Sequence, residues 1–567
     1  MSNDVHYELF VCRSRSGGWQ LLEAAANRMA ALERATQVME AGEALAVRVT
    51  KEAFDTATGE FQSLTIKELG EIPRLRESVE VKAELPCFRP QDLYSLHARK
   101  TITRLLKEQL GCWKLTTIEL LHRADAIEKL EATGTVLQHA IQKVAVAHAG
   151  STRQPVQEIV RKLNDLVARA IERIYQDARA RRFPKIQKDD IGAVVREILD
   201  KPDPDYLLGA AIAEALAGKK TFKDKLAQLL TFVERAPKDK AANALCLEVV
   251  DHFVAEMVSG SAALSELIGQ HEELGDALLF MADLFLGSIK PGTDGVHPGV
   301  VSLAAAFKAD RLPNAKSALA QRIMGDLKGV RRLSPSSLEG ELDMSRRLAT
   351  KMVMGQGKFL SIEEITEAFA VRSKRLVTAE IINDYIAGFD RPDQRIERLI
   401  ALEENVIGAE NKRALAGYIL PVITAHSTES ALIDGSAPVL RRLSRLAELE
   451  RAAREAGFDE RDKRLMAEAL DGLALQLVTR ANLFETILRR PGASYDKAVA
   501  LLRLFARGVL TSGEVSSQAR VLVRRLMRQS DFAASLGGEG GPARIEALKA
   551  LLSEAGVDPS ESGRSAA

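Results

Sequence analysis

The side chains in this sequence that could bind a metal ion are nine histidines and four cysteines. Zinc sites place such ligands at short, fixed spacings such as HExxH or CxxC, and the sequence contains neither spacing. Cys87, His97 and Cys112 are separated by ten and fifteen residues, which matches no familiar ligand set. The two cysteines stand close to Phe88 and Trp113, a setting typical of thiols that pack in a core. We therefore expect no metal site.

Two pairs of aspartates raise the question of magnesium chemistry, because helical enzymes that ionise prenyl diphosphates bind Mg²⁺ through clustered aspartates. Asp189 and Asp190 are adjacent, and Asp203 and Asp205 follow in the same segment. The first pair lacks a third carboxylate one helical turn later. Lys188 and Asp189 instead resemble the N-terminal cap of the helix that follows, so this segment is not expected to be catalytic.

A loop that cradles phosphate would need a glycine-rich turn ending in GKS or GKT after a strand. The nearest stretch is MGQGKF, Met354 to Phe359, which lacks that ending and follows no predicted strand. It is expected to be a turn between helices. No local sequence resembles a nucleophile elbow, although side chains distant in sequence can still assemble a site. We predict no catalytic residue, no cofactor-binding residue and no cofactor.

Runs of basic residues suggest contact with nucleic acid. They are RARRFPK (Arg179 to Lys185), Arg331-Arg332, Arg346-Arg347, Arg441-Arg442, Arg489-Arg490 and Arg524-Arg525. Phosphate binding would require these runs on one face with aromatic or polar base readers nearby, yet they are dispersed and interleaved with acids. The whole chain carries 79 Lys and Arg against 78 Asp and Glu, a net charge of +1. Nucleic acid is therefore not an expected partner.

The first 75 residues predict a small α+β module of the form ββαββ. Period-two alternation and turn residues mark its strands. The strands are expected at Tyr7–Cys12, Gly18–Glu23, Ala44–Phe54 and EFQSLTIKEL, with a helix in NRMAALERATQVMEAG and a turn at Asp55–Gly59. A module of this size has little core of its own and lies near its stability limit without a partner surface.

From about residue 85 onward the pattern is helical throughout. Apolar residues recur at helical spacing in QEIVRKLNDLVARAIERIYQDARARR. The stripe consists of Ile159, Leu163, Leu166, Ala170, Ile171 and Ile174. Sustained period-two alternation does not occur in this part of the sequence, and aromatic residues make up 5% of the chain. The fold class is therefore predicted to be mainly α, with the small module at the N-terminus.

Three segments of the helical region share the spacing of their apolar doublets. The first doublets are Leu229-Leu230, Leu399-Ile400 and Leu501-Leu502, and the second doublets, twenty residues later, are Val249-Val250, Ile419-Leu420 and Val521-Leu522. Leu216, Ile386 and Ile487 precede, and Leu264, Leu432 and Leu536 follow. Two interpretations stay open: a divergent helical-repeat array, or chance recurrence of a motif that is common in helical proteins.

Breaks rich in Gly, Pro and Ser divide the chain further. They lie at Gly287–Val300, Arg331–Glu341 and Gly537–Pro542. The predicted domains are the module at 1–75, a helical domain at 85–190, repeat-like helical domains at 191–290, 300–435 and 436–536, and a terminal segment at 537–567. That last segment comprises a glycine hinge, an amphipathic helix and a disordered tail.

The terminal helix, in ARIEALKALLSEAG, places Ile545, Leu548, Leu551 and Leu552 on one face. We predict these four residues as a partner-binding surface, because an amphipathic helix beyond a hinge can fill a groove on another protein. The same helix could instead cap the helical region by docking on it.

The functional expectation is a non-enzymatic scaffold or adaptor in signalling or assembly, which binds other proteins and is able to associate with itself. The alternative is a helical enzyme or a small-ligand sensor with a pocket between helices. No signal peptide is recognised, and the longest apolar stretch, Ala277–Gly287, is too short for a bilayer. Four cysteines without a paired framework fit a reducing compartment, so a cytoplasmic location without a membrane partner is expected.

Overall fold

The computed structural model describes residues 5–13, 20–55, 60–70, 87–152, 154–292, 295–335, 337–537 and 541–557. The chain forms two compact units, and each is described by itself. The first unit comprises residues 1–84 and 146–154, and the second comprises residues 85–145 and 155–567. The start of the second predicted strand, most of the turn at Asp55–Gly59, the middle of the glycine hinge and the predicted tail lie outside the described residues.

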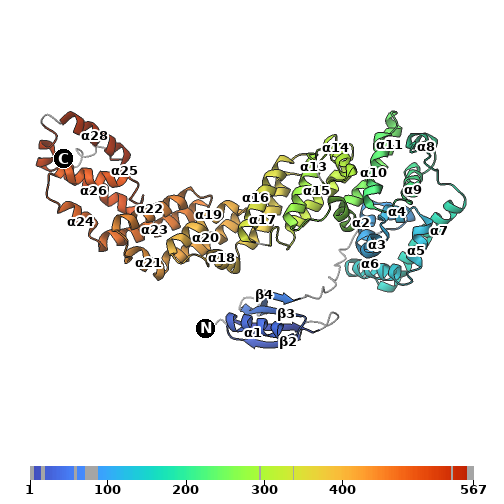
Figure 1. The fold of residues 1–567 in the computed structure, drawn as a ribbon, viewed down its shortest axis with the longest axis horizontal. Helices are drawn as coiled ribbons and strands as arrows, with labels where there is room; N and C mark the ends of the chain where they lie inside the picture. The colour runs from blue at the N-terminus through green and yellow to red at the C-terminus, as the bar shows by residue number, and fades with distance from the viewer. Residues whose placement is uncertain are drawn as a thin grey trace. The chain divides into compact units, whose positions relative to one another are not determined.

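The first unit is the predicted ββαββ module. Its elements are β1 (Val5–Cys12), β2 (Gln20–Ala25), α1 (Arg28–Glu40), β3 (Ala46–Asp55) and β4 (Glu60–Gly70). The strands pair antiparallel in the order β2-β1-β3-β4 (Figure 1). Strand β2 pairs with one edge of β1. Helix α1 then returns the chain to the other edge of β1, where β3 pairs.

One face of α1 covers the sheet. Ala31, Ala35 and Val38 recur at helical spacing and are buried, so they pack against the strand residues that alternate inward, such as Val11 and Val49. This small core is the only one that the described part of the first unit contains.

The second unit is helical, as predicted. Its helices are η1 (Pro90–Tyr94), α2 (Leu96–Leu105), α3 (Lys107–Trp113), α4 (Thr117–Leu120), α5 (Ala124–Glu131), α6 (Val136–Thr152, of which the part from Val146 groups with the first unit), α7 (Val156–Arg179), α8 (Ile191–Ile198), α9 (Pro204–Leu216), α10 (Phe222–Glu234), α11 (Lys240–Ser259), α12 (Ser261–Ile268), α13 (Leu274–Leu286), α14 (Pro298–Lys308), α15 (Pro313–Lys328), α16 (Leu338–Met354), α17 (Ile362–Leu376), α18 (Ala379–Ile386), α19 (Pro392–Leu402), η2 (Glu403–Asn405), α20 (Ala409–Thr424), α21 (His426–Ile433), α22 (Val439–Glu455), α23 (Glu460–Arg480), α24 (Leu483–Leu488), α25 (Ser494–Ala506), α26 (Glu514–Met527), α27 (Ser530–Ala534) and α28 (Gly541–Glu554).

Within this unit, helices pack on near neighbours in the chain (Figure 1). One series runs α11, α15, α17, α20, α23 and α26, each in contact with the next. A second set consists of the pairs α10 with α14, α13 with α16, α19 with α22, and α25 with α28. Such stacking buries the apolar stripe of each helix against the helices beside it.

Two large hydrophobic cores result, beside a smaller third core formed by residues between Leu106 and Ile174. The first gathers buried side chains from Ile118 to Phe369, and the second gathers those from Leu342 to Val557. Helices α16 and α17 contribute to both cores, since Met344 and Phe369 belong to the first and Leu342 and Leu376 to the second. These two helices are therefore the joint between the cores.

The three segments with similar spacing share an order of helices. The first doublets lie on α10, α19 and α25, and the second doublets lie on α11, α20 and α26. The burial of corresponding residues differs between the segments, because Val249 of the first segment is 3% exposed whereas Val521 of the third segment is 59% exposed. The repeat interpretation therefore stays a prediction. Every helix among the described residues is too short or too polar to cross a lipid bilayer.

Candidate functional site

The terminal helix predicted as a partner-binding surface forms as α28 and packs on α25. Leu548 and Leu552 are buried in the second core, at 6% and 4% exposure, and Leu551 is partly buried beside them. Ile545 is 38% exposed. Leu548 and Leu552 could bind a partner only if α28 left the second core. Partner binding by this helix stays a prediction.

The residues considered for metal binding do not converge. Among the described residues, no group of three or more His, Cys, Asp or Glu side chains is arranged to hold a metal ion. Cys112 is exposed and forms no disulfide. The MGQGKF stretch forms a turn after α16, where Gly357 and Leu360 form an isolated bridge.

The aspartates near residue 190 have structural partners. The cap of α8 is Asp190, whose Oδ1 accepts a hydrogen bond from the Ala193 N–H at 3.1 Å. The sequence placed this cap at Lys188 and Asp189, one residue too early. Asp189 instead accepts a hydrogen bond from Gln228 Nε2 at 2.9 Å. These carboxylates therefore position helices.

The same role recurs for acids throughout the helical unit. Each of four carboxylates accepts a backbone N–H in the first turn of a different helix, where the helix dipole favours negative charge. The pairs are Glu266 with Phe222 of α10 (2.7 Å), Asp251 with Ala315 of α15 (2.8 Å), Asp471 with Glu514 of α26 (2.6 Å) and Asp531 with Ser494 of α25 (2.8 Å). We call these four acids the capping carboxylates. They hold neighbouring helices in register.

A cluster of aromatic rings surrounds His122 near the start of the helical unit. The ring lies 5.1 Å from Tyr94 and 5.3 Å from Tyr206 between centroids, and Nδ1 donates to the Ile118 carbonyl at 2.6 Å. Burial lowers the pKa of His122 to about 4. A Cβ at position 209 would lie 2.7 Å from Nε2, which explains Gly209. This neutral, enclosed ring is a packing element.

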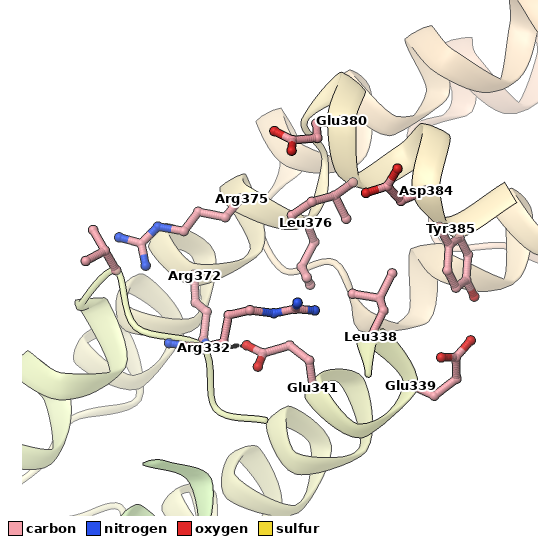
Figure 2. A pocket seen from close by; sticks show the side chains of 12 residues that line it. Arg332, Leu338, Glu339, Glu341, Arg372, Arg375, Leu376, Glu380, Asp384 and Tyr385 are labelled. Carbon is pink, nitrogen blue, oxygen red and sulfur yellow. Dashed lines mark hydrogen bonds and ion pairs between the residues drawn. The ribbon is translucent and has the colours of Figure 1, made fainter. Parts of the chain in front are cut away.

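A surface pocket of about 570 Å³ lies where α16, α17 and α18 meet the loop after α15 (Figure 2). We call it the mixed pocket, because apolar side chains and both signs of charge line it. The sequence assigned Arg331–Glu341 to a linker, but Arg332, Leu338 and Glu341 from this stretch form one wall. Their contribution depends on α17 and α18, which close the pocket from the other side.

A buried ion pair fixes the base of the mixed pocket. Arg372 lies with its Nη2 at 2.6 Å and its Nε at 3.1 Å from Oε1 of Glu341. It also donates to the carbonyls of Leu327 at 3.1 Å and Arg331 at 2.9 Å. The second oxygen of Glu341 accepts the Ser334 N–H at 2.9 Å. Each partner of this pair is satisfied, so the pair is a rigid support.

Apolar side chains remain accessible above this support. Val330 is 86% exposed, and Leu338 and Ile381 are half-buried. Figure 2 shows Arg332 extending into the pocket between Leu376 and Glu341. A patch of this kind, apolar and next to charge, is typical of surfaces that take part in recognition.

The opposite rim carries acids and a fixed aromatic ring. Glu380 and Asp384 project from α18 toward the pocket (Figure 2). Arg398 of α19 lies over the Tyr385 ring at 4.7 Å and binds Glu339 at 2.8 Å. Three arginines and four carboxylates therefore line the pocket, and their charges nearly cancel.

The mixed pocket was not among the sites that the sequence indicated, since its residues come from four separate segments. It combines accessible apolar side chains, charges of both signs and a completely hydrogen-bonded ion pair at its base. No protein-family model matches this chain, and neither a curated protein nor a solved structure matches it. Function is therefore inferred from the arrangement of the described side chains.

Proposed function

We propose that this protein is a cytoplasmic, non-enzymatic scaffold that binds other proteins, and that the mixed pocket is its docking site. The observation that supports this proposal is Val330, an apolar side chain that is 86% exposed beside charges of both signs. Apolar contacts flanked by paired charges are how protein interfaces combine affinity with register.

The chemistry of the pocket indicates what a partner would offer. An apolar side chain would cover Val330 and Ile381, and a basic side chain would lie near Asp384. An acidic side chain would lie near Arg332. A peptide segment with these three features would be matched in both polarity and charge. A polyanion would not be matched, since the pocket carries at least as many carboxylates as arginines.

The test compares partners captured from the native cell by the wild-type chain, by Val330→Asp and by Val521→Asp. Val521 is 59% exposed on α26 and does not line the mixed pocket, so it is a matched control. We expect a defined set of proteins that Val330→Asp loses and Val521→Asp keeps, with the melting temperature of both variants within a degree or so of wild type. Retention of every partner by Val330→Asp would contradict the proposal.

The terminal helix gives a second test of the scaffold. Ile545→Asp changes the most exposed residue of its predicted face without disturbing the buried Leu548 and Leu552. Loss of a partner in this variant would assign α28 to binding. Light scattering of the wild-type chain at several concentrations would show whether self-association contributes. A change in mass with concentration would identify a second copy as one of the partners.

A further inference from the structure

A second cleft lies between α2 with the start of α3 on one side, and the α11–α12 junction with α15 on the other. Its volume is about 400 Å³. It adjoins a smaller cavity of about 40 Å³, which shares Thr103, Lys107, Glu256, Gly260 and Ser261 with it. We call the two together the basic cleft. Its main part has the size of small-molecule sites.

Positive charge predominates in the basic cleft. Arg99, Lys100, Arg104 and Lys107 line it, and Glu256 is the one carboxylate among its lining residues. Lys100 and Arg104 lie one turn apart on α2, and Lys107 begins α3. Lys100 reaches across the cleft, with its Nζ 3.4 Å from Oε1 of Gln321 on α15. Lys100 thus faces the helix opposite it.

Neutral donors add to this charge. The small cavity is lined by the first residues of α12, Ser261 to Ala263, and by Gly260 before them. The backbone N–H groups of a first turn have no partner within their own helix, and Gly260 has no side chain with which to cap them. The start of α12 therefore offers the kind of N–H group that binds oxyanions.

An incompletely satisfied ion pair forms the inner wall. Nε of Arg99 lies 3.2 Å from Oε1 of Glu256, and the two side chains are 5% and 8% exposed. Neither of these two buried atoms makes an aligned hydrogen bond among the described residues. The other oxygen of Glu256 accepts the Ile118 N–H at 2.8 Å. A buried guanidinium with one weakly matched partner favours a further anion beside it.

We propose that the basic cleft binds the phosphoryl group of a small molecule, with Lys100 and Lys107 closing on the phosphoryl oxygens and the start of α12 donating N–H groups to them. This ligand site goes beyond the proposed protein docking, and it lies on other helices. The basic cleft has room for one compact group. A nucleic acid would instead need a row of basic side chains that continues along the protein surface.

The test is calorimetric titration of the full chain with inorganic pyrophosphate and, separately, with inorganic phosphate. The variants are Lys100→Gln, Lys107→Gln and the double variant, and Lys374→Gln is the control because Lys374 is an exposed lysine of α17 that lines none of the pockets described above. We expect one saturable site in the wild type, about tenfold weaker in the double variant, and unchanged in the control. Lysine-to-glutamine changes at exposed positions leave the fold intact.

Three results would overturn the proposal. The first is the absence of saturable binding of either anion by the wild-type chain at millimolar concentration. The second is equal weakening in Lys374→Gln, which would show a diffuse charge effect. The third is displacement of pyrophosphate by a single-stranded oligonucleotide that binds far more tightly than a nucleoside diphosphate. That result would identify a surface for polyanions. Tighter binding of the nucleoside diphosphate or of a sugar phosphate than of pyrophosphate would support the site and narrow its ligand.

Discussion

The basic cleft and the mixed pocket are both built from several helices around a buried Arg–Glu pair, yet the two pairs differ. In the mixed pocket, Arg372 and Glu341 share two aligned hydrogen bonds, and further hydrogen bonds to the backbone complete both partners. In the basic cleft, Arg99 and Glu256 lie close without alignment. A completed pair supports the structure, whereas an incomplete pair leaves charge that a ligand can use.

Breaking the completed pair should have the largest effect. Glu341→Ala leaves Arg372 buried at 5% exposure without its carboxylate, so we expect the free energy of unfolding to fall by roughly 3–5 kcal/mol. Denaturant titration measures it. Glu339→Ala, on the exposed side of the same helix turn, should change that free energy by less than about 0.5 kcal/mol. Similar losses of unfolding free energy in Glu341→Ala and Glu339→Ala would show that burial of the Arg372–Glu341 pair does not determine its contribution to stability.

Breaking the incomplete pair should cost less. Burial raises the pKa of Glu256 to about 7, against the opposing effect of Arg99, so part of the population is already neutral at neutral pH. We expect Glu256→Ala to lower the free energy of unfolding by roughly 1–3 kcal/mol. A loss as large as that of Glu341→Ala would show that the two ion pairs contribute equally to stability.

Anion binding in the basic cleft should depend on pH through Glu256. Arg99 from α2 faces this carboxyl, as do Glu119 and the Ile118 N–H from α4, and His252 stays neutral because burial lowers its pKa to about 4. Protonation of Glu256 removes the negative charge that opposes an anion, so affinity rises as the pH falls through about 7.

Sulfate is the probe for this effect because its own charge is constant in that range. We expect wild-type affinity for sulfate to weaken roughly threefold between about pH 6 and pH 8, and Glu256→Gln to flatten the profile. A Glu256→Gln profile as steep as that of the wild type would assign the dependence to another group.

The smallest expected effect concerns whether positive charge alone is sufficient to bind a phosphoryl group. Asp384→Lys leaves more cations than carboxylates around the mixed pocket, but the buried Arg372 stays completely paired. We expect no saturable binding of pyrophosphate at the mixed pocket of this variant, and a free energy of unfolding within about 0.5 kcal/mol of wild type. Binding there with the affinity of the basic cleft would show that an incompletely paired buried arginine is not needed for a phosphoryl site.

The architecture was readable from the sequence because it depends on local periodicity. Alternation in Tyr7–Cys12 and Ala44–Phe54 predicted strands that the structure contains as β1 and β3. The stripe through Ile159, Leu166 and Ile174 predicted a helix, and these three residues are buried on one face of α7. Patterns of this kind are set by which face of an element meets the core.

The sites were not readable, because they depend on contacts between distant segments. Ile118 and Glu256 are 138 residues apart, and Glu341 and Arg372 are 31 apart. The basic residues of α2 are visible in the stretch HARKTITRLLKEQLG. The sequence does not show that α12 and α15 lie opposite them, and this position is what makes the cleft. The break predicted at Arg331–Glu341 begins after the end of α15 at Lys328 and overlaps the first turn of α16, and it gave no sign that this stretch lines a pocket.

The joint at α16 and α17 has a mechanical consequence. Because these two helices contribute to both cores, a force that pulls one core away from the other is transmitted through them. Arg372, tied to carbonyls of the preceding loop and to Glu341, resists sliding at that point. A protein bound in the mixed pocket, as proposed above, would contact both α16 and α17 and would therefore oppose the same sliding.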